Sequence, residues 1–179
     1  MTNDDSVYVR LKNRYKFAIM VLLVCAGFSS EAQTSSQAEL HAAYLYNFAK
    51  YIKWPQDPDK YTIGALSDDE TMEILQNTLK EKRVGGKEIV LKRIIKVEEV
   101  IECQIVYLSE SNSKKLDQVK AISKEKSVLI VTEEDLIKKG ASISFVVEDD
   151  RLRFKLKKSA LQDAGLIPSD GLLKLAIVF

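Results

Sequence analysis

The chain alternates between two kinds of hydrophobic pattern. Runs of consecutive or alternating apolar residues, typical of strands, are separated by stretches in which apolar residues recur every three or four positions, as in amphipathic helices. Strands are predicted at residues 61–66, 88–95, 104–108, 127–131, 141–147 and 151–156, and helices or helical turns at residues 68–79, 97–101, 113–125, 135–139, 159–164 and 171–179. This order predicts an α/β fold, a compact sandwich of a mostly parallel sheet with helices packed on it. The turn residues 148–150 predict that the last two strands form an antiparallel edge hairpin.

The chain's most aromatic segment, His41 to Pro55, is predicted to be the first helix of this fold. The helix is expected to begin after a cap at Ser35 or Ser36 and to end at Trp54, because the residue before a proline avoids helical geometry. Its apolar residues cover about 200° of a helical projection, which suits a helix packed on a sheet. The predicted core face consists of Leu40, Ala42, Tyr44, Leu45, Phe48, Ala49, Tyr51 and Ile52.

Other residues of the same segment are predicted to lie where the helix meets solvent. Lys50 flanks the apolar face. Asn47 lies at its border, and because a buried asparagine needs hydrogen-bond partners, it is predicted to tie the helix to a neighbouring loop. Trp54 and Pro55 leave the helix and are predicted to be partly exposed. An aromatic residue beside lysines is typical of a protein-interface anchor, and packing of Trp54 in the core is the alternative.

The N-terminal segment has the order of a secretory signal peptide. Basic residues between positions 10 and 16 precede an apolar run at residues 17–28, and Ser30 and Ala32 then supply the small residues of a cleavage site. The run is shorter than the roughly twenty apolar residues of a membrane-spanning helix. A lipid anchor at Cys25 and a buried helix are the alternatives. The predicted organisation is a signal peptide at residues 1–32, a linker at residues 33–37 and an α/β domain at residues 38–179.

Removal of residues 1–32 would leave a chain of balanced charge. That segment carries four of the 27 basic and three of the 26 acidic residues, so 23 of each remain. A balanced charge gives no long-range field that would attract nucleic acid or an anionic membrane. Cys103 is then the one remaining cysteine, and its strand-like surroundings predict a buried thiol. Pairing of this thiol between two chains is the alternative.

No combination of residues predicts a catalytic or metal site. His41 is the only histidine; it is predicted on the exposed edge of the first helix, and no further metal ligands stand at a fixed spacing from it. Gly85-Gly86-Lys87 lacks the remaining residues of a phosphate-binding loop and is interpreted as a turn. The acidic residues at 133–135 and 149–150 are explained by a helix start and a turn. The sequence therefore predicts a non-enzymatic protein without metal or cofactor.

Several stretches agree with a known family in order and spacing. The opening stretch is Tyr44-Leu-Tyr-Asn-Phe-x-Lys-Tyr-x-x-Trp-Pro55. Tyr61 to Leu66, Gly85 to Val90 and Cys103 to Ser109 follow it, and Arg153-Phe-x-Leu, Ala164-Gly-Leu166 and Leu172-Leu-x-Leu-Ala176 complete the set. In these stretches the chain resembles the YfiR family, also called DUF4154, over roughly residues 38–177.

The resemblance implies a regulator that is exported to the periplasm of a Gram-negative bacterium. Such a protein binds the periplasmic domain of an inner-membrane diguanylate cyclase and represses it, which controls cyclic-di-GMP and biofilm formation. It also implies an OmpA-like outer-membrane lipoprotein as a second partner and a homodimer. The interaction or structural residues that match the family's motifs are Tyr44, Asn47, Phe48, Lys50, Tyr51, Trp54, Pro55, Phe154, Gly165 and Leu166.

The chain departs from the family pattern at two positions. Lys157 stands where the family usually has an asparagine, and Cys103 has no second cysteine in the domain, so control by an intramolecular disulfide is not expected. The alternative function is a periplasmic small-ligand sensor or solute-binding module, with an aromatic pocket around Trp54 and Tyr61.

Overall fold

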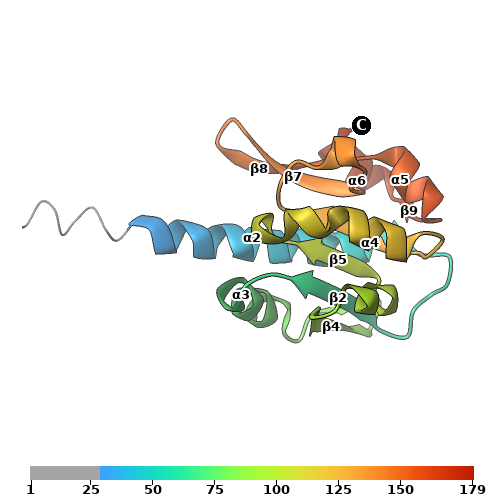
Figure 1. Cartoon of the computed structure of the whole chain (residues 1–179), viewed down its shortest axis with the longest axis horizontal. Coiled ribbons are helices and arrows are strands. Elements are labelled where there is room, and N and C mark those ends of the chain that lie inside the picture. Colours follow the sequence, from blue (N-terminus) through green and yellow to red (C-terminus); the bar gives the residue numbers. More distant parts are fainter. Residues whose placement is uncertain (1–28) are drawn as a thin grey trace, which may run out of the picture. The chain divides into compact units, whose positions relative to one another are not determined.

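An eight-stranded mixed sheet organises the computed structural model, which describes residues 29–179, with side chains from residue 37 onward (Figure 1). The strand order is β10-β8-β7-β6-β5-β2-β4-β3. The neighbouring pairs from β4 to β7 are parallel, whereas β3 and β8 run antiparallel to β4 and β7. The prediction of an α/β fold with a mostly parallel sheet is therefore confirmed.

The elements follow the predicted order closely. The strands are β1 (Ile52–Lys53), β2 (Tyr61–Leu66), β3 (Arg83–Val84), β4 (Lys87–Arg93), β5 (Ile105–Leu108), β6 (Leu129–Thr132), β7 (Ile143–Glu148), β8 (Arg151–Leu156), β9 (Ile167–Pro168) and β10 (Ile177–Val178). The helices are α2 (Ser29–Tyr51), α3 (Asp69–Leu79), α4 (Leu116–Ser123), α5 (Lys158–Asp163) and α6 (Asp170–Leu175), with 3₁₀ helices η1 (Val97–Glu102), η2 (Glu110–Lys115) and η3 (Ile137–Lys139).

Side chains along the central strands point alternately to the two faces of the sheet, so the core has two layers. Ile105 and Tyr107 of β5 pack in the same cluster as Leu45 of α2, whereas Val106 and Leu108 pack in a second cluster. Successive side chains of a strand point to opposite faces of a sheet, so both faces of the central strands are covered. The first cluster also takes in residues of α3, α5 and α6, and the second takes in residues of η1 and α4.

Helix α2 differs from its prediction at one end of its apolar arc. Leu40 and Tyr51 are 47% and 42% exposed, although both were predicted to be core residues. The buried residues of α2 are Ala38, His41, Ala42, Leu45, Phe48 and Ala49. At about 100° per residue this face is narrower than the predicted arc, and His41 lies within it. The prediction that His41 lies on an exposed edge is wrong.

The predicted start of the first helix is also wrong. Helix α2 begins at Ser29, upstream of the expected caps Ser35 and Ser36. The predicted signal peptide, residues 1–32, lies outside the described residues except for its last four. Within residues 29–179, no helix is both long and apolar enough to cross a bilayer.

The hairpin of β7 and β8 forms as predicted, but it is not the edge of the sheet. Its turn residues Asp149 and Asp150 have φ values of 51° and 56°, the left-handed conformation that a two-residue hairpin turn requires. Strand β10 pairs in parallel with β8 and lies outside it. This strand has two residues, which is too short to produce a recognisable alternation in the sequence.

Candidate interaction surface

The fold separates the predicted site residues into buried and exposed sets. The buried members are Phe48, Trp54, Phe154 and Leu166, the half-buried members are Tyr44 and Asn47, and the exposed members are Lys50, Tyr51, Pro55 and Gly165. Without a change of fold, a partner protein can reach the exposed members and part of the half-buried ones, but not the buried ones. The buried members can therefore affect a partner only through the positions of the exposed ones.

Aromatic residues from both ends of the domain meet in the core. The ring of Phe154 on β8 lies edge-on to Phe48, at 5.2 Å between centroids, and to Tyr44, at 5.5 Å. The Tyr44 hydroxyl donates a hydrogen bond of 3.1 Å to the carbonyl oxygen of Leu152. Offset and edge-on aromatic pairs are worth about 0.5–1.5 kcal/mol each beyond the area they bury. The opening and C-terminal family motifs thus stabilise the same core.

Asn47 does not behave as predicted. Its side chain is half-buried, and among residues 37–179 it forms no hydrogen bond to a neighbouring loop. Tyr46, the preceding residue, makes that kind of connection instead, because its hydroxyl donates to the carbonyl oxygen of Arg83 at 3.4 Å.

Trp54 is a core residue, so the prediction of partial exposure is wrong. Its side chain is 6% exposed, and its indole Nε1 donates a hydrogen bond of 2.9 Å to the carbonyl oxygen of Ser127. The ring lies edge-on to Tyr61 at 5.6 Å. The two aromatic rings that were predicted to line a ligand pocket therefore contact each other and fill the space between them.

The exposed members gather around a two-stranded antiparallel sheet formed by β1 and β9. Its register places Lys53 opposite Ile167, and directly opposed residues project from the same face of such a pair. Tyr51 precedes β1, and its carbonyl oxygen accepts a hydrogen bond of 2.9 Å from the backbone N–H of Ser169. We define the β1–β9 surface as the exposed residues Lys50, Tyr51, Lys53, Pro55 and Ile167.

The β1–β9 surface combines exposed apolar groups with two lysines. Ile167 is 63% exposed and Tyr51 is 42% exposed. The Lys50 ammonium lies 5.1 Å from the centroid of the Tyr51 ring, a cation–π contact worth about 0.5–1 kcal/mol at an exposed site. Neither Lys50 nor Lys53 forms an ion pair within the part of the chain that the structure describes. The surface is therefore suited to a partner that is apolar at its centre and acidic at its rim.

Contact between Pro55 and Gly165 fixes the border of this surface. Gly165 has a φ of 69°, and a Cβ atom there would lie 3.0 Å from Pro55 Cγ. Glycine therefore meets two requirements at once, a left-handed backbone and close approach of a proline ring. Leu166 follows it into the core. Sequence reasoning identified both family-motif residues but missed Ile167, which lies in a two-residue strand without a periodic pattern.

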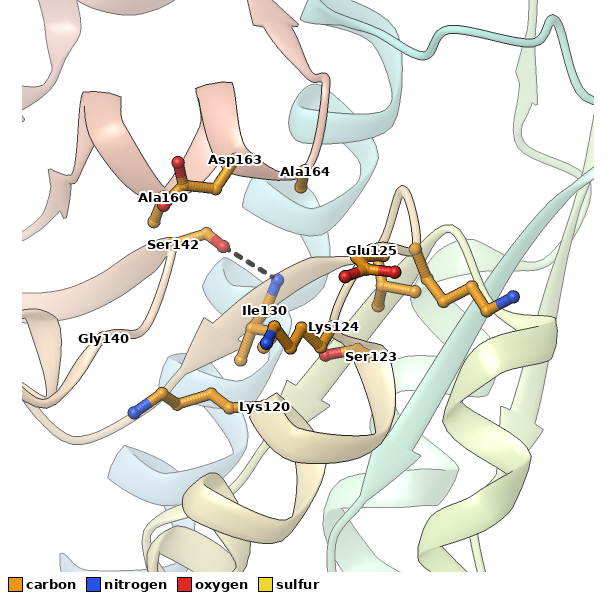
Figure 2. A pocket seen from close by; sticks show the side chains of 12 residues that line it. Lys120, Ser123, Lys124, Glu125, Ile130, Gly140, Ser142, Ala160, Asp163 and Ala164 are labelled. Carbon is orange, nitrogen blue, oxygen red and sulfur yellow. Dashed lines mark hydrogen bonds between the residues drawn. The ribbon is translucent and has the colours of Figure 1, made fainter.

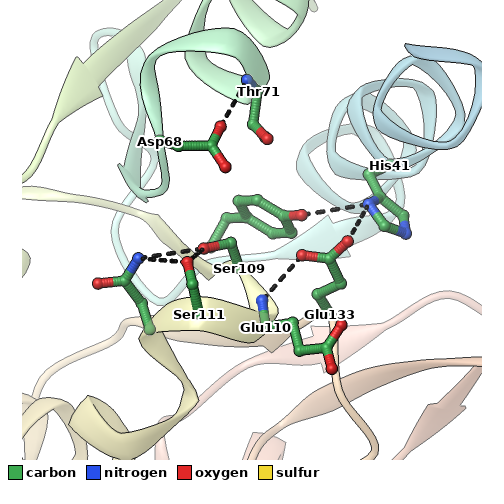
Figure 3. Close-up of polar contacts among 9 residues, drawn as sticks. His41, Asp68, Thr71, Ser109, Glu110, Ser111 and Glu133 are labelled. Carbon is green, nitrogen blue, oxygen red and sulfur yellow. Dashed lines mark hydrogen bonds and ion pairs between the residues drawn. The ribbon is translucent and has the colours of Figure 1, made fainter. Parts of the chain in front are cut away.

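A buried polar cluster links α2 to the sheet (Figure 3). His41 Nδ1 lies 3.1 Å from the hydroxyl oxygen of Tyr107 and 3.8 Å from Glu133 Oε1. The imidazole ring stacks on Phe145 at 4.3 Å. Glu133 Oε2 in turn accepts a hydrogen bond of 2.8 Å from the backbone N–H of Glu110. Sequence reasoning missed this cluster, because the partners of His41 lie 66 or more positions away in the chain.

Burial sets the protonation states in this cluster. Desolvation lowers the pKa of His41 to about 4. Desolvation, followed by the charge of Glu133 and a hydrogen bond to it, raises the pKa of Tyr107 far above its usual range. Both side chains are therefore neutral at pH 7. The cluster connects α2 to β5 and to the segment after β6.

Further polar residues lie at the carboxyl ends of β2 and β5, where open α/β sheets commonly bind ligands. Asp68 caps α3 by accepting a hydrogen bond of 2.8 Å from the Thr71 N–H. The Ser109 and Ser111 hydroxyls lie 3.0 Å apart. Figure 3 shows that these groups are directed at their own neighbours. Asp68 is thus explained as the N-cap of α3, whereas the hydroxyl of Ser109, which precedes η2, bonds to neighbouring side chains and makes no cap hydrogen bond.

An open hollow of about 330 Å³ lies between α4, the start of β6 and α5 (Figure 2). Its apolar lining includes Val128, Ile130 and Ala160, and its lining lysines include Lys120 and Lys124. The Lys120 ammonium donates to the carbonyl oxygen of Lys139 at 2.6 Å. The hollow is a shallow apolar depression with a mixed charged rim. Among the residues described, no three His, Cys, Asp or Glu side chains are placed to hold a metal ion.

Comparisons with known proteins agree with the fold and with the family resemblance. The family model described as YfiR/HmsC-like, DUF4154, matches residues 38–177. A search of curated proteins gives no match.

Two solved structures share the fold at low sequence identity. A conserved domain protein from Vibrio cholerae O1 biovar eltor is 12% identical with a TM-score of 0.51, over 79% of this chain and 59% of that one. The ABC domain in complex with L-Trp from Streptococcus pneumonia is 13% identical with a TM-score of 0.54, over 76% of this chain and 59% of that one. The chain thus spans 59% of each of these structures, and the likeness concerns the fold alone.

Proposed function

The chain belongs to the YfiR/HmsC-like family, and from that premise we propose that it is a periplasmic regulator of an inner-membrane signalling protein. It binds the periplasmic domain of a diguanylate cyclase-like protein and represses it, which controls cyclic-di-GMP signalling and biofilm formation. Family membership supports a partnership with a signalling protein. That the signalling protein is a cyclase, and that binding represses it, are our inference.

The β1–β9 surface is the observation that carries the proposal. Interface centres are enriched in aromatic residues and depleted of charge, and a polar rim surrounds them. Tyr51 and Ile167 supply an exposed apolar centre, and Lys50 and Lys53 supply a cationic rim. Tyrosine is enriched among the few interface residues whose truncation costs about 2 kcal/mol or more of binding free energy. We therefore place the partner's acidic and apolar residues against this surface.

Repression follows from a difference in affinity between two states of the partner. A ligand shifts a conformational equilibrium only by as much as it prefers one state. A regulator that binds the inactive periplasmic conformation about 100-fold more tightly stabilises that conformation by about 3 kcal/mol. No catalytic group is needed for this action. An OmpA-like outer-membrane lipoprotein that binds the regulator would compete with the signalling protein and release it.

Site-directed crosslinking in cells tests the proposal. A photo-crosslinking residue replaces Lys53 in the tagged full chain, and captured proteins are identified by mass spectrometry. The same residue at Val147, which is 65% exposed on the β7–β8 hairpin, is the control. We expect an inner-membrane protein with a periplasmic sensor region and a cytoplasmic signalling output from position 53 only. Self-crosslinks alone would overturn the repressor mechanism and would favour the proposed homodimer.

A matched pair of substitutions measures the contribution of the surface. Ile167→Ser removes an apolar side chain that is 63% exposed, and Val147→Ser removes one that is 65% exposed. We expect Ile167→Ser to weaken partner binding about tenfold, since losing one interface residue of this kind costs about 1–2 kcal/mol. Val147→Ser is expected to leave binding unchanged. Equal effects of the two substitutions would place the interface elsewhere.

A small-ligand sensor is the second candidate, and the hollow beside α4 favours it. One structure that shares the fold was solved with L-Trp bound. The single tryptophan of the chain can report on this hollow, because its hydrogen-bond acceptor Ser127 lies between Lys126 and Val128, which line it. A shift of Trp54 fluorescence on adding candidate metabolites other than tryptophan would support the sensor. No shift, together with a crosslinked membrane partner, would reject it.

A further inference from the structure

The His41 side chain is buried between α2 and the sheet. The residue is 1% exposed, its ring stacks on Phe145 with an interplanar angle of 18°, and its Nδ1 faces the Tyr107 hydroxyl. The second ring nitrogen, Nε2, is buried and has no hydrogen-bond partner among residues 37–179. A neutral imidazole tolerates this arrangement, because only one of its nitrogens carries a proton.

A protonated imidazole cannot be accommodated in the same position without cost. Both nitrogens of an imidazolium are donors, and its Nε2–H would be a charged donor without an acceptor in the interior. An unpaired buried donor destabilises the folded state, and it does so more strongly when it is charged. Protonation therefore favours conformations in which the ring has left this position.

We propose that His41 is an acid-operated latch that holds α2 on the sheet at neutral pH and releases it when the imidazole is protonated. The released element is the segment of α2 from residue 38 onward, which carries Lys50 and Tyr51 at its C-terminal end. Loosening this helix disorders the β1–β9 surface, so acid weakens partner binding. The latch itself stands apart from the proposed function, and only this last step rests on it.

The groups around the ring decide the direction of the effect. Glu133, which follows β6, has its Oε1 3.8 Å from Nδ1 and favours the charged ring. Tyr107 on β5 is neutral, Phe145 on β7 is apolar, and Tyr44 on the next turn of α2 also packs against Phe145. Burial outweighs the Glu133 carboxylate, and the pKa of His41 falls from 6.5 to about 4. The stability that the neutral His41 ring contributes is therefore fully present above pH 6.5 and is lost as pH falls through about 4.

Because His41 is the only histidine in the chain, its titration can be followed without assignment ambiguity. The NMR shift of its ring C–H protons is recorded against pH for protein purified from cells that express the full chain. We expect a pKa at least one unit below 6.5. In parallel, protection of α2 amides from hydrogen exchange is expected to fall at least tenfold more than protection of β5 amides between pH 7 and pH 4.5. An unshifted pKa, or equal losses in α2 and β5, would overturn the latch.

Two variants separate the latch from general acid unfolding. His41→Gln retains a polar group toward Tyr107 but cannot be protonated. In this variant, protection of the α2 amides from hydrogen exchange is expected to be nearly independent of pH. Glu133→Gln removes the favourable charge and is expected to lower the His41 pKa further. Acid sensitivity that persists in His41→Gln would contradict the proposal.

The captured partner is then tested for release at pH 4.5. Release from the wild type but not from His41→Gln is expected. Retention despite a confirmed latch would reject only the link to binding.

Discussion

The indole Nε1 of Trp54 donates a hydrogen bond of 2.9 Å to the carbonyl oxygen of Ser127, which lies 73 positions later in the chain. This bond ties the segment after α2 to the loop that leads into β6. It also explains why a residue next to a proline, where the helix has already ended, is buried and not exposed. The aromatic part of Trp54 packs on Tyr61 while its one polar group is satisfied, as is usual for buried tryptophans.

Trp54→Phe is expected to destabilise the protein by about 1–3 kcal/mol, because the Ser127 carbonyl loses its donor and the smaller ring leaves a void. The free energy of unfolding is measured with urea and followed by circular dichroism, since the variant has no tryptophan to report fluorescence. Tyr51→Phe, at an exposed position, is the control and is expected to change it by less than about 0.5 kcal/mol. Equal effects would mean that Trp54 is not held as described.

Gly165→Ala is expected to destabilise the fold by about 1–2 kcal/mol. The φ of 69° disfavours any side chain, and the added Cβ would lie 3.0 Å from Pro55 Cγ. Gly171→Ala is the matched control, because its Cβ would meet nothing closer than 3.9 Å and it lies inside α6. There alanine is expected to be neutral or slightly stabilising. The midpoint temperature of thermal unfolding is measured for both variants. A Gly165→Ala midpoint equal to that of the wild type would refute the role assigned to Gly165.

The α/β architecture could be predicted from sequence because its strands are long enough to show a pattern. Tyr61 to Leu66 is apolar at nearly every position and is a buried central strand. The burial of individual side chains depended instead on distant partners. His41 lies within the buried face of α2, where Tyr107 and Phe145 contact its ring, whereas Tyr51 on the same helix is 42% exposed. Ile167 lies in a two-residue strand, where no periodicity can be recognised.

Cys103 is expected to be unreactive in the folded protein. Its side chain is buried, its Sγ lies 3.7 Å from the carbonyl oxygen of Glu99, and desolvation raises its pKa to about 11. A thiol is nucleophilic only as the thiolate, so reaction with a disulfide reagent at pH 8 is expected to be at least 100-fold slower in the folded than in the unfolded protein. In a chain that carries Cys25→Ser, Cys103 is the one thiol whose reaction is measured. Rapid reaction of the folded protein would revive the alternative of a disulfide between chains.

Lys157 stands at the N-cap of α5 and makes no side-chain cap hydrogen bond. Asparagine is among the best N-cap residues, since its side-chain oxygen accepts a hydrogen bond from an otherwise unpaired N–H of the first turn. A lysine there also places a positive charge at the positive end of the helix dipole. Lys157→Asn is therefore expected to stabilise the protein by about 0.5–1.5 kcal/mol in urea unfolding. Lys157→Ala removes the charge without supplying the oxygen and is expected to recover less than half of that gain. If both variants gain equal stability, the charge of Lys157 and not the missing cap lowers the stability of the wild type. If neither variant gains stability, the first turn of α5 is stabilised by the packing of Leu161 alone.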